Sequence, residues 1–496
     1  TLKPGNSPGT ITVAGDYIQS GAFELEIAGK KNFDRLIVGG NASLSGTLTV
    51  IPYGGYQLKH GQKFTFLEAS SITGAFDKTI LPGGFRARLL EDDGDLTLLL
   101  APESYTQLAV TPNQKNLAKA LDKFIDGKGD RDAVSEALDH LSAEEYPKAF
   151  EEILPHLYAS LGNITLEQSF NQGQLLQQRF GTLALAPRGF SMSGMRLPVV
   201  AEKSTGSGKK DIMLATEDNP WGVWVQAHGL FAEATLSNIP NYHHDSGGFL
   251  IGADYRWSDR FATGLFAGYH GTIARYDGDG RVDIDASRFG AYATYVDGNG
   301  FYANAMLSGG FSRYTVRRNI DFGDLHRSTR STPSGGEFAA MLGGGYDWRV
   351  GGFSLGPIAS AQYTYVKVNG TTERGARSLD LRIDDYDLNS LRTTLGARVA
   401  YTWLPMKDVA VIPELRASWQ HEYLNGSRSL WATLDGGTGP GFQYVAASPE
   451  RNALFAGASL TFLVGNRWSA NVAYNLNAGG GDFRSHTLSV GVNISF

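Results

Sequence analysis

The C-terminal stretch HTLSVGVNISF, residues 486–496, alternates polar and apolar side chains without a break. Its apolar members occupy every second position: Leu488, Val490, Val492, Ile494 and Phe496. Successive side chains of a strand point to opposite faces, so this spacing predicts a β-strand with one apolar and one polar face. The stretch ends on an aromatic residue, whereas most termini are frayed. The fold must therefore give both faces of this strand, up to its last residue, a suitable environment.

Composition indicates a large β-rich protein. The 496 residues include 62 Gly and 18 Pro, and 42% are hydrophobic. This balance is typical of glycine-punctuated β structure and excludes a disordered chain. The net charge of −6 gives no basic field that would favour a nucleic-acid partner. The absence of cysteine excludes disulfides and thiolate metal sites.

The sequence has no apolar run long enough for a transmembrane helix, which needs about 18 residues or more. Membrane β-strands of roughly 9–11 residues would escape that test. The first ten residues lack the apolar segment of a signal peptide. If the protein is exported, we expect this chain to be the downstream part of a longer one.

Residues 1–101 contain short alternating runs, such as FELEI at 23–27, RLIV at 35–38 and TLTV at 47–50. They recur without helical segments between them, a pattern that fits either a β-solenoid or a β-sandwich. We favour the solenoid.

Residues 102–219 change to helical periodicity, followed by a Gly/Ser/Lys-rich loop. Pro155 is expected to kink a helix. Within a helix over about 163–185, polar side chains occupy much of the circumference: Gln168, Asn171, Gln172, Gln174, Gln177, Gln178 and Arg179. Such a helix has little to bury against an oily core and suits a polar, water-filled tube. A surface linker helix is the alternative.

Residues 220–496 contain twelve alternating segments, which begin near Trp221, Phe249, Phe261, Ser287, Phe301, Glu337, Phe353, Ser390, Val409, Asn452, Trp468 and Ser485. Charged residues occupy the face opposite the apolar one, as Arg392, Arg398, Glu414 and Arg416 show. In a hydrated lumen such charges are tolerated, whereas in a soluble core they would be unfavourable. Connections alternate between short turns and long segments. The pattern predicts an all-β fold with a helical linker, whose C-terminal part is a 12-stranded antiparallel transmembrane β-barrel.

The order of solenoid end, helical linker and twelve-stranded barrel resembles the monomeric autotransporters of type V secretion. WGVWVQAHG at 221–229 is similar to the family's first barrel strand, and SVGVNISF at 489–496 is similar to its barrel-assembly signal. The resemblance covers essentially the whole chain. It implies a passenger β-helix end at 1–101, a linker with a pore-threading helix at 102–219, and a translocator barrel at 220–496.

The resemblance also implies location and partners. The barrel would insert in the bacterial outer membrane, with residues 1–101 on the cell surface. Partners would be outer-membrane lipid, the barrel-assembly machinery, periplasmic chaperones and the chain's own passenger, with the protein acting as a monomer. Some family members cleave the passenger at an Asn-Asn pair in the pore helix. This sequence has only isolated Asn163 and Asn171 there, so we do not expect such cleavage.

No catalytic, cofactor or metal site emerges. The stretch YDGDGRVDID at 276–285 lacks the ligand pattern of a calcium loop, because Arg281 replaces an oxygen ligand. His243 and His244 are adjacent and would point to opposite faces of a strand. We therefore expect no enzymatic activity in this chain. Two other functions stay open: a plugged porin, and a surface adhesin or enzyme whose active part lies upstream.

Overall fold

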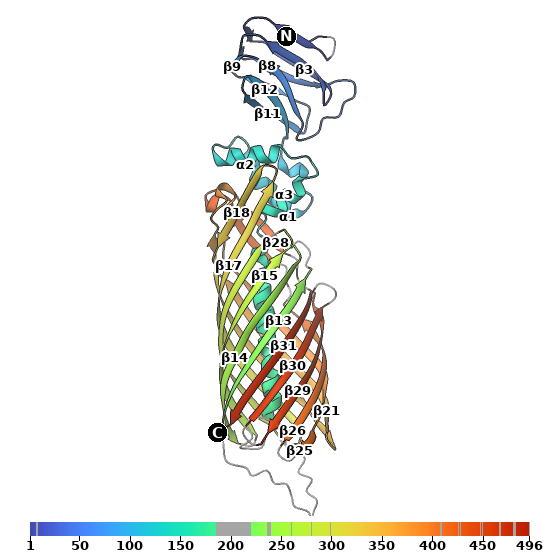
Figure 1. The fold of residues 1–496 in the computed structure, drawn as a ribbon, viewed down its shortest axis with the longest axis vertical. Helices are drawn as coiled ribbons and strands as arrows, with labels where there is room; N and C mark the ends of the chain where they lie inside the picture. Colours follow the sequence, from blue (N-terminus) through green and yellow to red (C-terminus); the bar gives the residue numbers. More distant parts are fainter. Residues whose placement is uncertain are drawn as a thin grey trace, which may run out of the picture.

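The computed structural model describes residues 1–495 except 6–7, 185–219, 236–239, 259, 279, 298, 407–408, 425, 427, 447, 449, 466–467 and 480–482. The molecule is elongated, with a small β unit at the N-terminal end, a cluster of helices in the middle and a long barrel (Figure 1). The C-terminus lies at the end of the barrel that is far from the helices (Figure 1).

Three parallel sheets make up the N-terminal unit. Each of three successive rungs adds one strand to each sheet. The sheets are β1 (Thr10–Val13), β5 (Arg35–Val38) and β8 (Lys63–Glu68); β2 (Tyr17–Gln19), β6 (Asn41–Leu44) and β9 (Ser71–Gly74); β3 (Ala22–Gly29), β7 (Thr47–Pro52) and β10 (Lys78–Ile80). Short β4 (Asn32–Phe33) pairs with β3. This parallel stacking is that of a solenoid rather than of a sandwich.

A hairpin closes the last rung of the solenoid. Strands β11 (Phe85–Asp92) and β12 (Asp95–Pro102) pair antiparallel, and β12 pairs antiparallel with β8. The core between the three sheets is apolar, with Phe23, Phe64 and Phe66 almost fully buried.

Helices follow the hairpin: η1 (Tyr105–Leu108), α1 (Pro112–Leu121), η2 (Asp122–Phe124), α2 (Asp130–Asp139), α3 (Tyr146–Ile153) and α4 (His156–Ala184). The expectation that Pro155 only kinks a helix was wrong. α3 ends at Ile153, Leu154 is extended, and α4 begins after the proline. The proline ring disfavours helical geometry at the preceding residue, so the chain breaks instead of bending.

Twelve antiparallel strands form a closed barrel, which confirms the predicted fold class. They are β13 (Trp221–Ala234), β14 (Tyr242–Ser258), β15 (Phe261–Tyr276), β16 (Arg281–Val296), β17 (Phe301–Phe322), β19 (Ser334–Tyr346), β21 (Phe353–Val368), β24 (Tyr386–Tyr401), β26 (Val409–Glu422), β29 (Asn452–Val464), β30 (Trp468–Gly479) and β31 (Phe483–Ser495). β31 pairs with β13 over thirteen residue pairs and closes the ring. The ring leaves no open edge at membrane depth.

Five strands begin two to seven residues earlier than the sequence predicted: β14, β16, β19, β24 and β31. All five enter the barrel from its long-loop end. At that end the outward residues include polar and charged side chains, such as His243, Asp283 and Arg281, so the apolar alternation ends before the strand does. The barrel wall therefore continues beyond its apolar band.

Additional elements extend both ends of the barrel. At the outer end, β18 (Leu325–Ser331) forms a hairpin with β17, and a small sheet contains β22 (Thr371–Thr372), β23 (Arg382–Ile383), β27 (Arg428–Thr433) and β28 (Gly441–Ala446). Single turns η3 (Arg377–Leu379) and η4 (Asp435–Gly437) lie beside it. At the other end, β20 (Trp348–Val350) and β25 (Trp403–Met406) extend β21 and β26.

The two barrel faces differ as the alternation predicted. Large apolar side chains such as Leu265, Leu307 and Leu342 are more than half exposed on the outside, while Gln226, Arg288 and Asn475 are buried inside. None of the described helices is both long and apolar enough to span a membrane.

Candidate functional site: the helix-filled barrel lumen

Helix α4 runs along the barrel axis, visible behind the front strands in Figure 1. It comes within hydrogen-bonding distance of β13–β16, β21, β24, β30 and β31. Glycines let it approach the wall closely. A Cβ at Gly162 would lie 2.0 Å from Cδ1 of Leu388, and one at Gly173 would lie 2.3 Å from Oε1 of Gln362. Substituting either glycine would therefore push the helix or the wall side chain away.

An ion pair joins the C-terminal part of α4 to the wall. Arg179 donates two hydrogen bonds to Oδ2 of Asp254 on β14, at 2.5 and 3.1 Å. The same oxygen accepts from the Tyr292 hydroxyl at 2.9 Å, and Trp224 Nε1 donates to that hydroxyl at 2.8 Å. Arg179 and Asp254 are 7% and 2% exposed. The pair is thus shielded from bulk water, and loss of either partner would leave an uncompensated buried charge.

Glutamine side chains of α4 form hydrogen bonds with different strands of the barrel wall. Gln178 Oε1 accepts from Gln226 Nε2 at 2.9 Å and from Asn471 Nδ2 at 3.3 Å. Gln168 bonds to Thr272 and accepts from Arg288 Nη2 at 3.3 Å. Arg288 in turn forms a bidentate pair with Glu337 on β19.

The other predicted pore-helix residues also face the lumen wall. Asn171 Oδ1 accepts from the Thr487 hydroxyl at 3.0 Å. Gln177 Nε2 lies 3.6 Å from the sulfur of Met341. Gln174 is buried beside a small cavity that Asn171 and Thr487 also line.

The predicted lumen charges point inward and have partners. Arg392 lies 3.4 Å from Glu167 of α4 and stacks over the Phe170 ring at 4.4 Å. Arg398 pairs with Asp347 at 2.5 Å and with Glu414 at 3.2 Å. Arg416 donates to Asn475 Oδ1 at 2.9 Å. Of the four, Arg392 makes the described ion pair and ring contact with α4, and Nη1 of Arg398 lies beside Gly181 of the same helix.

A cavity of about 90 Å³ lies beside α4, with lining residues from β14, β24, β26, β29, β30 and β31. Asn163, His244 and Gln420 line it, and among the described residues both polar side-chain atoms of each are buried without a hydrogen-bond partner. Buried polar groups in a cavity of this size are normally satisfied by water. This part of the lumen is suited to hydration. His243 points outward while His244 points inward, so the two cannot share one ion.

An apolar stripe on α4 was not predicted. Leu175, Leu176, Phe180 and Leu183 are almost fully buried against an apolar patch of the wall: Trp224, Leu250, Phe266, Tyr292, Met306, Ala339 and Met341. The lumen is therefore polar on one side and apolar on the other, not uniformly wet. The sequence does contain Leu175, Leu176 and Phe180 at helical spacing. The stripe was not predicted because glutamines surround these three residues.

The outer mouth of the barrel is covered by the helical segment. Arg318 of β17 pairs with Glu373 at 2.6 Å and donates to the carbonyl oxygens of Glu152 and Ile153 at the end of α3. Arg327 of β18 pairs with Asp130 of α2 at 2.8 Å. Burial alone would raise the pKa of Asp130, but hydrogen bonds from Arg327 and Ser378 outweigh it and lower that pKa below 3.8.

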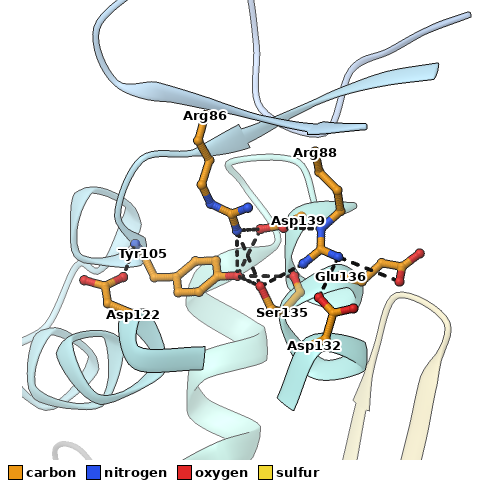
Figure 2. Close-up of polar contacts among 8 residues, drawn as sticks. All are labelled: Arg86, Arg88, Tyr105, Asp122, Asp132, Ser135, Glu136 and Asp139. Carbon is orange, nitrogen blue, oxygen red and sulfur yellow. Dashed lines mark hydrogen bonds and ion pairs between the residues drawn. The ribbon is translucent and has the colours of Figure 1, made fainter. Parts of the chain in front are cut away.

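A second polar network fixes the solenoid to the helices (Figure 2). Arg86 and Arg88 of β11 both reach the fully buried Asp139 of α2, at 2.5 and 2.8 Å. Arg88 also pairs with Asp132 at 2.9 Å. The Tyr105 hydroxyl donates to Asp139 at 2.9 Å, and burial together with that carboxylate raises the pKa of Tyr105. Solenoid, helices and barrel mouth are thus joined by successive ion pairs.

The residues of the C-terminal stretch line the outside of the barrel. Leu488, Val490, Val492 and Ile494 are 37–51% exposed on β31, while Ser489 and Asn493 face the lumen. Phe496 lies outside the described residues. Among the described residues no cluster of three or more His, Asp or Glu side chains could hold a metal ion.

Comparisons with known proteins give a family match over the barrel. Residues 223–475 match the family model of the autotransporter beta-domain. Esterase EstA of Pseudomonas aeruginosa is 24% identical over 50% of this chain and 38% of its own length. The BrkA autotransporter of Bordetella pertussis is 25% identical over 52% of this chain and 26% of its own length. The chain thus spans well under half of these relatives. The translocator domain of NalP from Neisseria meningitidis has a TM-score of 0.45 at 16% identity, over 57% of this chain and 91% of that domain.

Proposed function

Because the chain belongs to the autotransporter family, we propose that its barrel carries the preceding passenger to the cell surface and that residues 1–101 are the C-terminal part of that passenger. The barrel lies in the outer membrane. The observation that carries the proposal is the path of the chain. One uninterrupted helix, α4, occupies the lumen of a closed barrel and leads directly to the surface helices and the solenoid.

Assembly of the barrel depends on its last strand. β31 is a barrel strand with exposed apolar residues on one face, and it closes the ring by pairing with β13. Before closure this strand is an edge that another sheet could pair with. We infer that the barrel-assembly machinery recognises it by such pairing, with Leu488, Val490, Val492, Ile494 and Phe496 supplying specificity. Periplasmic chaperones would hold the chain until then, and lipid would surround the monomeric barrel.

Folding outside the cell would drive transport forward. Each solenoid rung buries apolar side chains against the previous one, and the hairpin β11–β12 closes the stack. A fully buried Phe or Leu contributes about 1.5–3 kcal/mol relative to exposure, so each rung that forms outside opposes return of the chain. Helix α4 then remains in the lumen as the plug.

The proposed function contains no chemical step in this chain. The name of esterase EstA describes the activity of that relative and is not carried over to this chain. Any hydrolytic activity of the complete protein would reside in passenger sequence that precedes residue 1.

Surface display tests the proposal. The chain would be produced behind a signal peptide, with an epitope tag before Thr1, and labelled with antibody on intact cells. We expect surface labelling, and loss of labelling in a variant that lacks residues 483–496. A tag that stays inaccessible on cells with normally inserted barrel would refute transport.

A plugged porin is the alternative, and conductance separates the two. Both functions predict low single-channel conductance for the whole chain and a higher one after deletion of residues 112–184. Only the translocator requires the tagged segment to reach the surface.

A further inference from the structure

Five arginines form one continuous row on the outside of the barrel, beyond its apolar band. The strand registers place Arg275 of β15 opposite Arg281 of β16, Arg281 opposite Arg317 of β17, and Arg317 opposite Arg330 of β18. Arg330 is bridged in turn to Arg374, with backbone hydrogen bonds of 2.9 and 3.1 Å in both directions. Directly opposed residues share a face, and at about 4.8 Å per strand the row is roughly 19 Å long.

The row faces outward and is accessible. The side chains of Arg275, Arg281 and Arg317 are 42–47% exposed, and Arg330 and Arg374 are also exposed. Figure 1 shows β17 and β18 rising above the other strands of the wall. The neighbouring inward positions, such as Val282 and Val316, are buried.

Like charges directly opposite each other destabilise a sheet, so this row opposes folding. The described carboxylates offset it only in part. Asp283 lies 2.7 Å from Arg281 and 2.9 Å from Arg317, and Asp245 lies 3.2 Å from Arg275.

At the end of the row formed by Arg330 and Arg374, no carboxylate pairing offsets the positive charge among the described residues. Within the part of the chain that the structure describes, neither Arg330 nor Arg374 takes part in an ion pair with a carboxylate, and both are exposed. Local violations of folding rules are typical of binding sites.

The height of the row above the apolar band follows from the number of residues between each arginine and the last outward apolar residue of its strand. On β15 the last outward apolar side chain is Ile273, two residues before Arg275. On β17 it is Phe311, which is 68% exposed and lies six residues before Arg317. At about 3.3 Å per residue and a tilt near 40°, the row climbs from roughly 5 Å to roughly 15 Å above the apolar band.

We propose that this arginine row binds the phosphorylated sugar headgroup of a glycolipid in the outer leaflet of the outer membrane. The planar guanidinium group binds phosphate oxygens in a bidentate manner and stays charged at any physiological pH. A glycerophospholipid phosphate lies close to the acyl chains and would reach only the lower end of the row. A phosphorylated oligosaccharide headgroup extends far enough to meet Arg317, Arg330 and Arg374. The inference rests on the outer-membrane location of the barrel and not on transport.

Binding of purified lipopolysaccharide of the deep-rough type to the whole chain in detergent tests the proposal. We compare the native chain with the triple variant Arg317→Ala, Arg330→Ala, Arg374→Ala. The matched control removes three exposed lysines of the solenoid: Lys30→Ala, Lys31→Ala, Lys59→Ala. Folding of each variant is checked by the shift in gel mobility between unheated and boiled samples.

We expect the triple arginine variant to bind at least tenfold more weakly and the lysine variant to bind like the native chain. An Arg→Lys version of the triple variant should fall between them, because charge remains and the bidentate geometry is lost. Dephosphorylated glycolipid should bind as weakly as the triple variant binds the intact lipid.

Several results would overturn the proposal. They are equal binding by the native and triple arginine chains, equal loss in the lysine control, and equal affinity for the dephosphorylated lipid. Tighter binding of heparin or DNA than of the glycolipid would also overturn it and would assign the row to a soluble polyanion. If the arginine variant does not fold, the comparison is made with Arg330→Ala, Arg374→Ala alone, whose side chains form no described ion pair. Because surface display is measured separately, failure here leaves the transport proposal intact.

Discussion

Replacing Arg179 by Ala should loosen the pore helix. The substitution leaves Asp254, 2% exposed, without its cationic partner. Breaking a buried ion pair on one side costs about 3–5 kcal/mol. The Tyr292 hydroxyl still donates to Asp254, so the low end applies, about 3 kcal/mol. At about 1.4 kcal/mol per tenfold change, the population of barrels with a displaced helix should rise roughly 150-fold.

Single-channel recording in planar bilayers measures this directly as an increased frequency of open events. Gln177→Ala is the matched control, because Gln177 lies on the same helix and its described contact is a weak one at 3.6 Å from sulfur. The double variant Arg179→Gln, Asp254→Asn should recover most of the native closure, since a neutral hydrogen-bonded pair leaves no buried charge. Native conductance in the Arg179→Ala variant would refute the reasoning, as would equal opening in Gln177→Ala.

Three further predictions concern the barrel, the cap and the solenoid. Val490→Arg puts a charge on the lipid face of β31 and should lower barrel stability by up to about 2–4 kcal/mol, seen as reduced outer-membrane insertion, whereas Val490→Thr should insert normally. The folded-state pKa of Asp130 is below 3.8, so its stabilisation is complete above that pH and is lost as the pH falls through the lowered value. Proteolysis of the helices over the barrel mouth, α1–α3, should accelerate below about pH 4, and the Asp130→Asn variant should show fast cleavage already at pH 6. Phe66→Ala removes a fully buried ring that packs 5.5 Å from Phe23 and should destabilise the solenoid by about 3–5 kcal/mol in urea unfolding.

The barrel could be predicted because contact with lipid requires a strict alternation of apolar and polar residues along each strand. Every membrane strand must place apolar residues on one face, so the alternation in β13, β24 and β26 was visible in the sequence. The same constraint made the strand starts on the short-turn side accurate. On the long-loop side, the outer surface of the wall is in water. Outward residues such as His243 and Asp283 interrupt the apolar alternation there, so the strand starts could not be predicted from it.

The partners of the polar residues could not be predicted. Arg398 was identified as a lumen charge, but its partner Asp347 directly follows β19, and β21 lies between that strand and β24 in the barrel. Asp254 occupies an inward position of β14 by the same alternation, and Glu373 is buried in the connection after β21, yet nothing local distinguishes either from other residues of its segment. The register between strands fixes which inward side chains come within reach of each other, and only then do the pairs follow. The arginine row has the same origin, because its members are scattered from 275 to 374 and only the register aligns them.

The apolar stripe of α4 changes the view of how the helix keeps its position in the pore. Hydrogen bonds of Gln168 or Gln178 exchange readily for water, so each contributes only about 0.5–1.5 kcal/mol. Burial of Leu175, Leu176, Phe180 and Leu183 contributes on the order of 6–12 kcal/mol relative to water, as an upper estimate. A shift of one residue along the chain rotates a helix by about 100° and would turn this stripe away from the apolar patch of the wall. The Arg179–Asp254 pair lies on the same side as the stripe, since Tyr292 and Trp224 belong to both. The polar residues make the helix compatible with the lumen, and the apolar stripe together with the ion pair selects a single position for it.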